Sequence, residues 1–577
     1  MSLSSIDPGA AAGRADTRAP LGASPSYDRV AGVHVLCVRG SFREMGEQHG
    51  SMLRREVATG PIPYYRQMVE KLLGKPLGPL SRPIAAVLQR AVGSRVRATM
   101  PDFAVETARG IARGAGLEEE EFLRGCTMPD SLLWVTARLN ELKAPGPAVA
   151  HRLALGLGCT SALAWGRSTR DGRLYHARNL DYYGVENWAQ NAALVFHRPA
   201  EGQRYVSVTA AGVGLGGVTA MNEAGLTLTV HQHMFTDRTR LGGTPIGVVG
   251  DVVMRRARSL DEAEAILRSH RSIGCWTYVI ADGRRQEVLS FEESPERQVA
   301  LRRGPSDGSY SYANVYEDAE LGATEIALYG SYWRHNMGRY ARAKELVGQG
   351  DLDARGMAKI LADRGSSSCR VRESIAMVMT VASVVFRPED GVLWLGTGDA
   401  PTSRGEFVPF SLEREGHAPE HGSFTTTEVG ERASDEAFEE YRRAYLAYVD
   451  RSDAEAAAAH LSRAAELDAG QPLYHSLTGL LCLEHGATSQ ADAALGRAIG
   501  LGHPDEERVA SFHLWRGRAR DVLGRRSDAL ADYRRCLGLR ADAPVHAAAR
   551  KNHARPFSDS ARRRMHVEMS LADVVAP

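Results

Sequence analysis

The order of apolar and polar positions divides the chain into three parts. Apolar residues alternate over 33–39, which predicts a short strand, and Ser41 and Glu44 then have capping-box spacing for a following helix. From there to about residue 142 the pattern is mainly helical and is broken at four prolines. The first part is therefore predicted to be a strand followed by a helical segment.

Short β-type runs separated by turn signals fill the second part, from Gly158 to about Leu412. The clearest runs are 160–165, 174–178, 205–209, 226–230, 277–280, 287–291 and 376–386. Asp-Gly and Asn-Glu-Ala-Gly turns join neighbouring runs, which favours antiparallel hairpins. Helical stretches near 250–269 and 333–348 interrupt them, so we expect an α+β layered domain.

Alanine- and arginine-rich helical periodicity follows Pro419, and it repeats. The segments 479–486 and 517–524 lie 38 residues apart, and Leu467 and Leu501, each closing a similar helix, lie 34 apart. This part resembles tetratricopeptide repeats, with three degenerate copies between about 434 and 545. Two interpretations stay open: a stack of helix pairs with a concave binding face, or a helical appendage that packs on the preceding domain and binds nothing.

Charge, cysteine content and the absence of long apolar runs exclude several classes of protein. The 577 residues carry 71 basic and 70 acidic side chains, so no global charge attracts nucleic acid or an anionic membrane. Seven cysteines argue against a disulfide framework. The first 26 residues lack the apolar segment of a secretory signal, and no uninterrupted apolar run reaches about 18 residues. We therefore expect a cytoplasmic protein with no membrane span.

The candidate chemistry centres on Gly158-Cys159-Thr160, at the start of a predicted strand. An Asp-Gly turn would lay the next strand, with Arg178 and Asp181, beside it. A free thiol has a pKa of about 8.5, and a nearby guanidinium favours the thiolate, while a carboxylate can orient an amine. Taken alone, these residues do not separate a nucleophile from a buried structural cysteine.

Further segments match a known family in order along the chain; they are 40–50, 221–226, 312–314, 338–342 and 366–370. With the Gly-Cys-Thr and Arg-Asn-Leu-Asp motifs, residues 30 to 412 resemble the acyl-CoA:6-aminopenicillanic acid acyltransferase (isopenicillin N acyltransferase) family. That family belongs to the N-terminal-nucleophile (Ntn) cysteine hydrolases and is related to the choloylglycine hydrolases. The resemblance implies an α+β fold: a four-layer αββα sandwich with a mainly helical N-terminal pro-segment. An all-α tetratricopeptide-like domain would follow.

The expected division of the chain follows from these patterns. It is a disordered tail (1–28), an N-terminal pro-segment (29–158), a catalytic core (159–412), a linker (413–433) and a repeat domain (434–577).

Residue roles are implied by the resemblance. Cys159 would be the nucleophile and, once the Gly158–Cys159 bond is cut, its α-amine the general base. Asp181 would hold that amine, and Arg178 would stabilise the thiolate or bind substrate. Asn314 would donate to the oxyanion and Arg339 would complete the polar network. Gln232 stands near the position of a second oxyanion donor, where the family has Asn.

Three functions remain open. The first is a self-activated amidohydrolase or acyltransferase acting on an amide or acyl-thioester, small molecule or peptide. The second is an inert hydrolase-like core that recruits a protein partner through its repeats, which the glutamine at 232 favours. The third is a tailoring acyltransferase delivered to a carrier by those repeats.

Other signals are interpreted as structural. The sequence predicts no cofactor and no metal: His231 and His233 lack a third ligand, and the glycine-rich segment 212–217 lacks the helix of a phosphate loop. A second Gly-Cys-Thr triplet, at Cys126, is not followed by a comparable strand, so Cys126 is interpreted as structural.

Overall fold

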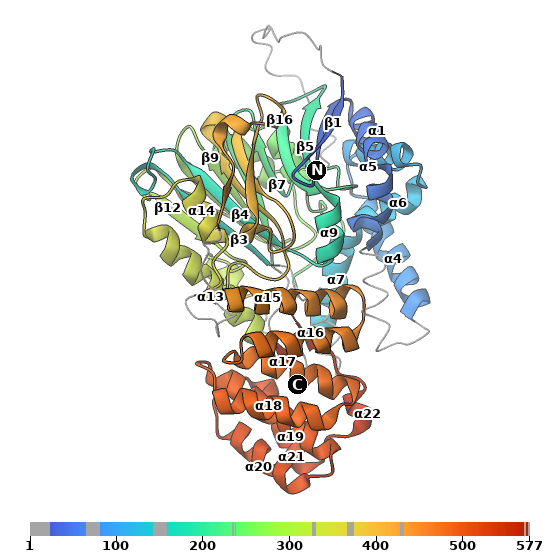
Figure 1. Cartoon of the computed structure of the whole chain (residues 1–577). Helices are drawn as coiled ribbons and strands as arrows, with labels where there is room; N and C mark the ends of the chain where they lie inside the picture. Colours follow the sequence, from blue (N-terminus) through green and yellow to red (C-terminus); the bar gives the residue numbers. More distant parts are fainter. Residues whose placement is uncertain are drawn as a thin grey trace.

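The computed structural model describes residues 24–64, 81–141, 158–233, 236, 238–325, 330–365, 374–426, 432–569 and 573–574. Two β-sheets form the centre of the molecule, helices cover them, and a C-terminal helical region (residues 432–569) lies at one end (Figure 1).

The N-terminal part begins with a hairpin and continues as helices. Its elements are β1 (Ser26–Val30), β2 (Val33–Gly40), α1 (Phe42–Met52), α2 (Arg54–Thr59), α4 (Ser81–Arg97), α5 (Asp102–Ala115), α6 (Glu119–Cys126) and α7 (Met128–Glu141). The capping box is confirmed: Ser41 caps α1 and exchanges hydrogen bonds with Glu44. Residues 26–28, predicted to end a disordered tail, instead belong to β1, which the turn at Ala31 and Gly32 folds onto β2.

Two glycines let α1 and α5 cross at close range. A Cβ at Gly46 would lie 2.3 Å from the Thr107 carbonyl oxygen, and one at Gly50 would lie 2.1 Å from that of Ile111. The glycines of the 40–50 motif therefore provide room for backbone contact between helices.

The middle part supplies most of the strands. Its elements are β3 (Gly158–Ala164), β4 (Tyr175–Asp181), α9 (Val185–Asn191), β5 (Ala192–Pro199), β6 (Tyr205–Ala210), β7 (Thr219–Asn222), β8 (Leu226–Gln232), α10 (Val248–Arg256), α11 (Leu260–Arg268), β9 (Trp276–Asp282), β10 (Glu287–Glu293), β11 (Gln298–Arg303), β12 (Ser309–Tyr312), α12 (Ala319–Gly322), α13 (Gly330–Gly348), α14 (Ala354–Leu361), β13 (Thr380–Arg387), β14 (Val392–Gly396), β15 (Glu406–Ser411), β16 (Gly416–His417) and β17 (Phe424–Thr425). Each of the predicted β-type runs overlaps one of these strands.

Among the described residues one sheet has nine strands, in the order β1-β2-β5-β6-β7-β8-β9-β10-β11. The other has the order β12-β3-β4-β13-β14-β15-β16, with β17 also on β15. Pairing is antiparallel as predicted, except that β2 lies parallel to β5. Strands β16 and β17 each pair with β15 of the second sheet, so the predicted linker 413–433 is partly sheet structure.

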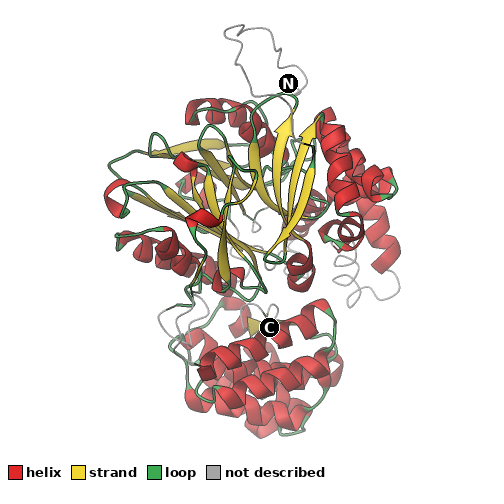
Figure 2. Cartoon of the chain, turned by 45° about the horizontal axis from the view of Figure 1, so that its top comes forward, coloured by secondary structure: helices red, strands yellow, loops and turns green. Residues whose placement is uncertain are grey.

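The two sheets pack face to face. One apolar cluster joins Leu163 and Trp165 of the second sheet region to Val279 and Val288 of the first. Helices α10 and α11 contact the outer face of the nine-stranded sheet, and α13 and α14 contact that of the other. Figure 2 shows helices on the outside of the strands. The layers therefore run helix, sheet, sheet, helix.

The C-terminal helical region consists of consecutive antiparallel neighbours. Its elements are α15 (Arg432–Tyr445), α16 (Ala454–Leu467), α17 (Pro472–His485), α18 (Thr488–Leu501), α19 (Glu506–Val522), α20 (Arg526–Leu537), α21 (Ala543–Ala554), α22 (Asp559–Arg562), β18 (Val567–Glu568) and β19 (Asp573–Val574). As predicted, Leu467 and Leu501 each end a helix. Gly479 permits close packing, because a Cβ there would lie 2.6 Å from Leu495 Cγ.

Candidate active site

Cys159 is the second residue of β3, directly opposite Leu180 of β4. Its side chain is buried, with 6% of the residue exposed. The antiparallel β3–β4 pair puts Gly158 opposite Asp181 and Ser161 opposite Arg178. The Asp-Gly turn thus brings the predicted arginine and aspartate beside the cysteine.

Arg178 holds a positive charge against the sulfur. Its Nη2 donates to Cys159 Sγ at 3.1 Å and to the Val230 carbonyl oxygen at 2.8 Å. Its Nη1 donates to the Val218 carbonyl oxygen at 2.5 Å and to the Thr219 hydroxyl. Because these acceptors come from the nine-stranded sheet, the guanidinium bridges the two sheets and is fixed in place.

The Cys159 thiol experiences opposing effects. Burial raises its pKa, the positive charge of Arg178 lowers it, and the negative charge of Asp181 raises it. Burial dominates, so the neutral thiol is the favoured form at neutral pH. Deprotonation therefore requires a base close to the sulfur.

Asn314 orients the backbone nitrogen of Cys159. It follows β12 with φ of 54°, a left-handed conformation that asparagine tolerates well. Its Oδ1 accepts the Cys159 N–H at 2.7 Å and an Arg339 N–H at 3.2 Å, while its Nδ2 donates to the Gln232 carbonyl oxygen at 2.8 Å. In this arrangement the amide faces the backbone nitrogen of Cys159, and Gln232 takes part through its backbone.

Asp181 places a buried carboxylate next to the predicted cleavage bond. Its Oδ1 accepts a hydrogen bond from Thr380 Oγ1 at 2.6 Å. Its Oδ2 is buried without a hydrogen-bond partner and lies 3.9 Å from Arg339 Nη1. Burial raises the pKa of Asp181, and the charge of Arg339 opposes that shift. This carboxylate is consequently a stronger base than an exposed aspartate.

Arg339, on α13, connects the other groups. Its Nη1 donates to the Cys159 carbonyl oxygen and to Thr160 Oγ1, both at 2.9 Å, and its Nη2 donates to Asn336 Oδ1 at 2.8 Å. The side chain is completely buried. The structure therefore brings five residues into one buried polar cluster around the cysteine; they are Cys159, Arg178, Asp181, Asn314 and Arg339.

The sequence reasoning gave no role to Thr160, which it named only as part of a motif, and it missed three polar side chains of this cluster: Thr219, Asn336 and Thr380. The sequence could have indicated Asn336, because this residue precedes Arg339 by three positions on a predicted helix and therefore lies on the same face. Nothing in the sequence indicated Thr380, because only the fold brings this residue to Asp181. The resemblance segment 366–370 lies outside the described residues.

Cys126, His231 and His233 lie outside the polar cluster around Cys159. Burial raises the pKa of Cys126 to about 12, and no charged partner opposes it. His231 Nε2 bonds Ser161 Oγ at 2.8 Å, and His233 Nδ1 bonds Glu325 at 2.9 Å. In the described part of the chain no group of three or more His, Cys, Asp or Glu could hold a metal ion, and the six cysteines there are free thiols.

Comparison with known proteins gives one family. A profile described as acyl-coenzyme A:6-aminopenicillanic acid acyl-transferase matches residues 167–400. The match supports that family, and with it an acyltransferase or hydrolase. It includes four of the five clustered residues and begins after Cys159.

Two other comparisons add little. No curated protein matches the chain. The N-terminal domain of stress-induced protein-1 (STI-1) from C. elegans is similar at 20% identity, covering 22% of this chain and 98% of that one, with a TM-score of 0.20. So low a score carries no argument.

Among the described helices, none combines the length and the apolar character needed to cross a membrane.

Proposed function

We propose that the chain is a self-activating cysteine enzyme of the Ntn type that transfers an acyl group through an acyl-Cys159 intermediate. One observation carries the proposal: the sulfur and the backbone nitrogen of Cys159 each contact a polar side chain. Arg178 contacts the sulfur of Cys159, and Asn314 accepts a hydrogen bond from its nitrogen. A cysteine that only fills the core needs no guanidinium against its sulfur.

The proposed activation begins at the Gly158–Cys159 bond. Asp181 Oδ2, which accepts no hydrogen bond and lies beside Gly158, takes the thiol proton. The sulfur then bonds to the Gly158 carbonyl carbon as the carbon–nitrogen bond breaks, and the proton passes to the departing nitrogen. Water hydrolyses the resulting thioester, giving a carboxylate on Gly158 and a free thiol and amine on Cys159. Arg339, bonded to the Cys159 carbonyl oxygen, holds the new N-terminus in place.

The N-terminal product would remain bound after cleavage. Its strand β2 lies between β1 and β5, with a parallel register from His34–Ala193 to Gly40–Pro199. The apolar side chains of β2, α1 and α5 form part of a continuous buried cluster with β5. Burial of this apolar surface favours association of the two chains after cleavage.

In the proposed catalytic cycle the freed α-amine takes the thiol proton, since an α-amino group has a pKa of about 7.7–8.0. Arg178 stabilises the thiolate, which bonds to the carbonyl carbon of an amide or thioester as its carbon–nitrogen or carbon–sulfur bond breaks. The departing amine or thiol takes the proton that the α-amine had received. Asn314, whose Oδ1 already faces the nitrogen, orients the amine. Its role as an oxyanion donor requires its Nδ2 to leave the Gln232 carbonyl oxygen once substrate is bound. Water or an amine then removes the acyl group.

We further propose that the chain is organised as a pro-segment (29–158), a core (159–412) and a repeat domain (434–577). Residues 1–23 lie outside the described part. Repeats of the tetratricopeptide type are supported by the helix ends 34 residues apart and by the close contact at Gly479.

A trapping experiment tests the catalytic proposal. Purified protein is mixed with a panel of N-acyl amino acids, acyl p-nitroanilides and acyl-CoA thioesters, quenched in acid and digested. We expect an acyl adduct on the Cys159 peptide, and hydroxylamine should divert the acyl group to a hydroxamate. Cys126→Ala, in the second Gly-Cys-Thr triplet, is the matched control and should retain the adduct, whereas Cys159→Ala should lose it. Turnover of these substrates by Cys159→Ala would refute the proposal.

A further inference from the structure

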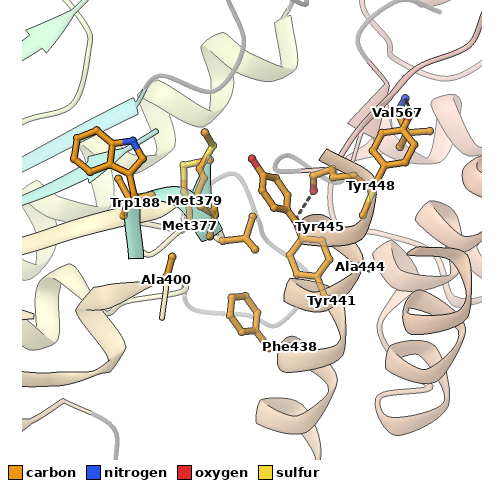
Figure 3. Packing of buried hydrophobic residues seen from close by; sticks show 14 of the residues in the cluster. Trp188, Met377, Met379, Ala400, Phe438, Tyr441, Ala444, Tyr445, Tyr448 and Val567 are labelled. Carbon is orange, nitrogen blue, oxygen red and sulfur yellow. Dashed lines mark hydrogen bonds between the residues drawn. The ribbon is translucent and has the colours of Figure 1, made fainter. Parts of the chain in front are cut away.

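The C-terminal helical region packs against the same segments that hold the candidate active site. Figure 3 shows Trp188, Met377 and Met379 facing Phe438, Tyr441 and Tyr445 of α15. All six belong to one buried apolar cluster that continues from the strands into the helices. Leu180, the register partner of Cys159, packs against the same cluster. The helical region is therefore continuous with the core beside the cysteine.

The segment 377–380 connects this junction to Asp181. The Met377 N–H donates to Thr380 Oγ1 at 2.9 Å, and that hydroxyl donates to Asp181 Oδ1 at 2.6 Å. The Met379 carbonyl oxygen accepts the N–H of Tyr182, the residue after Asp181, at 2.9 Å. The two methionine side chains of this segment meanwhile pack into the junction. A shift of α15 would consequently move the hydrogen-bond partner of Asp181.

A second connection runs through α13. Arg334 donates from both terminal nitrogens to the Asp542 carboxylate, at 2.7 and 2.6 Å. Asp542 directly precedes α21 of the helical region, whereas Arg334 lies on the helix that carries Asn336 and Arg339. Such a bidentate pair fixes direction as well as distance. This contact therefore ties the helix that carries Arg339 to the helical region, in addition to the packing of α13 on β3 and β12.

Further polar contacts hold the start of the helical region, residues 435–450, against the core. Asp435 Oδ1 accepts from Arg364 at 3.0 Å and from Arg404 at 2.7 Å. Asp450 accepts from Tyr64, of the N-terminal part, at 3.1 Å and from the Glu186 N–H at 3.2 Å. The helical region thus contacts both products of the proposed cleavage.

We propose that the C-terminal helical region is a positioning element of the active site, with Asp542 and Tyr445 as its positioning residues. Asp542 sets the orientation of α13 and Tyr445 that of the Thr380–Asp181 pair. This inference rests on the proposed function, because it concerns the rate at which Cys159 reacts. It assigns the helices a role within the reaction in addition to any partner that they bind.

The test uses the full chain and follows two readouts. The first is the fraction cut at Gly158–Cys159 against time in cell-free translation. The second is the rate of alkylation of Cys159 by iodoacetamide between pH 6 and pH 10, read by peptide mass spectrometry. Asp542→Ala should slow cleavage by about three- to thirtyfold and shift the alkylation profile, and Asp542→Glu should restore both. Asp528→Ala, which removes an exposed ion pair inside the helical region, is the matched control.

Tyr445 gives an independent variant. Its hydroxyl is buried without a hydrogen-bond partner, so Tyr445→Phe should behave as the wild type and Tyr445→Ala should resemble Asp542→Ala. Wild-type rates and pH profiles in folded Asp542→Ala and Tyr445→Ala would overturn the inference while leaving the proposed function intact. A wild-type chain that never cuts would instead refute the proposed function.

Discussion

Gly158 lies directly opposite Asp181 in the β3–β4 ladder, and a Cβ on Gly158 would lie 2.7 Å from Asp181 Oδ2. The glycine has no left-handed φ, so it is required here for space. Because glycine has no Cβ, a carboxylate oxygen that accepts no hydrogen bond can approach the bond that the proposed reaction cuts.

The first prediction concerns this close approach. Gly158→Ala should slow cleavage of the 158–159 bond at least tenfold, because the new methyl group must push Asp181 or Arg339 away. Gel analysis of a translation time course measures the rate. Gly304→Ala is the control, since a Cβ there meets nothing within 4 Å. Equal cleavage rates in the two variants would contradict a role for the close contact.

The second prediction separates the two ends of the Asn314 amide. Asn314→Asp keeps an acceptor for the Cys159 N–H but loses the donor to Gln232, whereas Asn314→Gly loses both and still tolerates the positive φ. Loss of a buried hydrogen bond costs about 1–3 kcal/mol. We expect cleavage to slow about tenfold to hundredfold in Asn314→Gly and less in Asn314→Asp.

If the glycine variant cuts as fast as the aspartate variant, the Cys159 N–H is not oriented by Asn314. Thermal unfolding of both proteins serves as the control for folding.

The third prediction is a pH dependence. Because the charge of Arg178 lowers the pKa of the Cys159 thiol, Arg178→Met should move the alkylation profile of Cys159 to higher pH and reduce its rate at pH 7 at least tenfold. Arg178→Lys keeps the charge but cannot reach Val218, Val230 and the sulfur together, so its effect should be intermediate. Arg173→Lys, at an exposed ion pair, should leave the profile unchanged.

The fourth prediction concerns stability. Burial raises the pKa of Asp130 to about 7, although the Ile246 N–H donates to its carboxylate. The folded chain therefore keeps a proton that the unfolded chain releases near pH 4. This contribution to stability is complete below pH 4 and is lost as pH rises through about 7.

Asp130→Asn removes that dependence. Between pH 4 and pH 8 the free energy of unfolding of the wild type should fall relative to that of Asp130→Asn by at most about 4 kcal/mol. Its melting temperature should fall accordingly. Calorimetry of both proteins across this range measures it. A constant difference would show that Asp130 titrates normally.

Much of this arrangement was predictable from local sequence. The Asp-Gly turn determined that Arg178 and Asp181 would lie beside Cys159, because two antiparallel strands joined by a short turn must pair. The capping box predicted the start of α1. These features depend on neighbours in sequence, where spacing alone specifies the geometry.

Features that depend on distant segments were not predictable. Thr380 reaches Asp181 only because β13 pairs with β4, and the orientation of the Asn314 amide depends on the Gln232 backbone in the other sheet. The resemblance gave the positions of Asn314 and Arg339, but their hydrogen bonds follow from packing. Composition likewise gave no sign that α15 would join the core beside the cysteine.

The central claim is that the Gly158–Cys159 bond is cut by Cys159 itself, and intact-mass spectrometry under denaturing conditions tests it most directly. The account predicts two polypeptides of 158 and 419 residues, the second beginning with Cys159, and a single chain of 577 residues for Cys159→Ala. A wild-type protein that turns over an amide or thioester substrate while every molecule retains the full mass would contradict it.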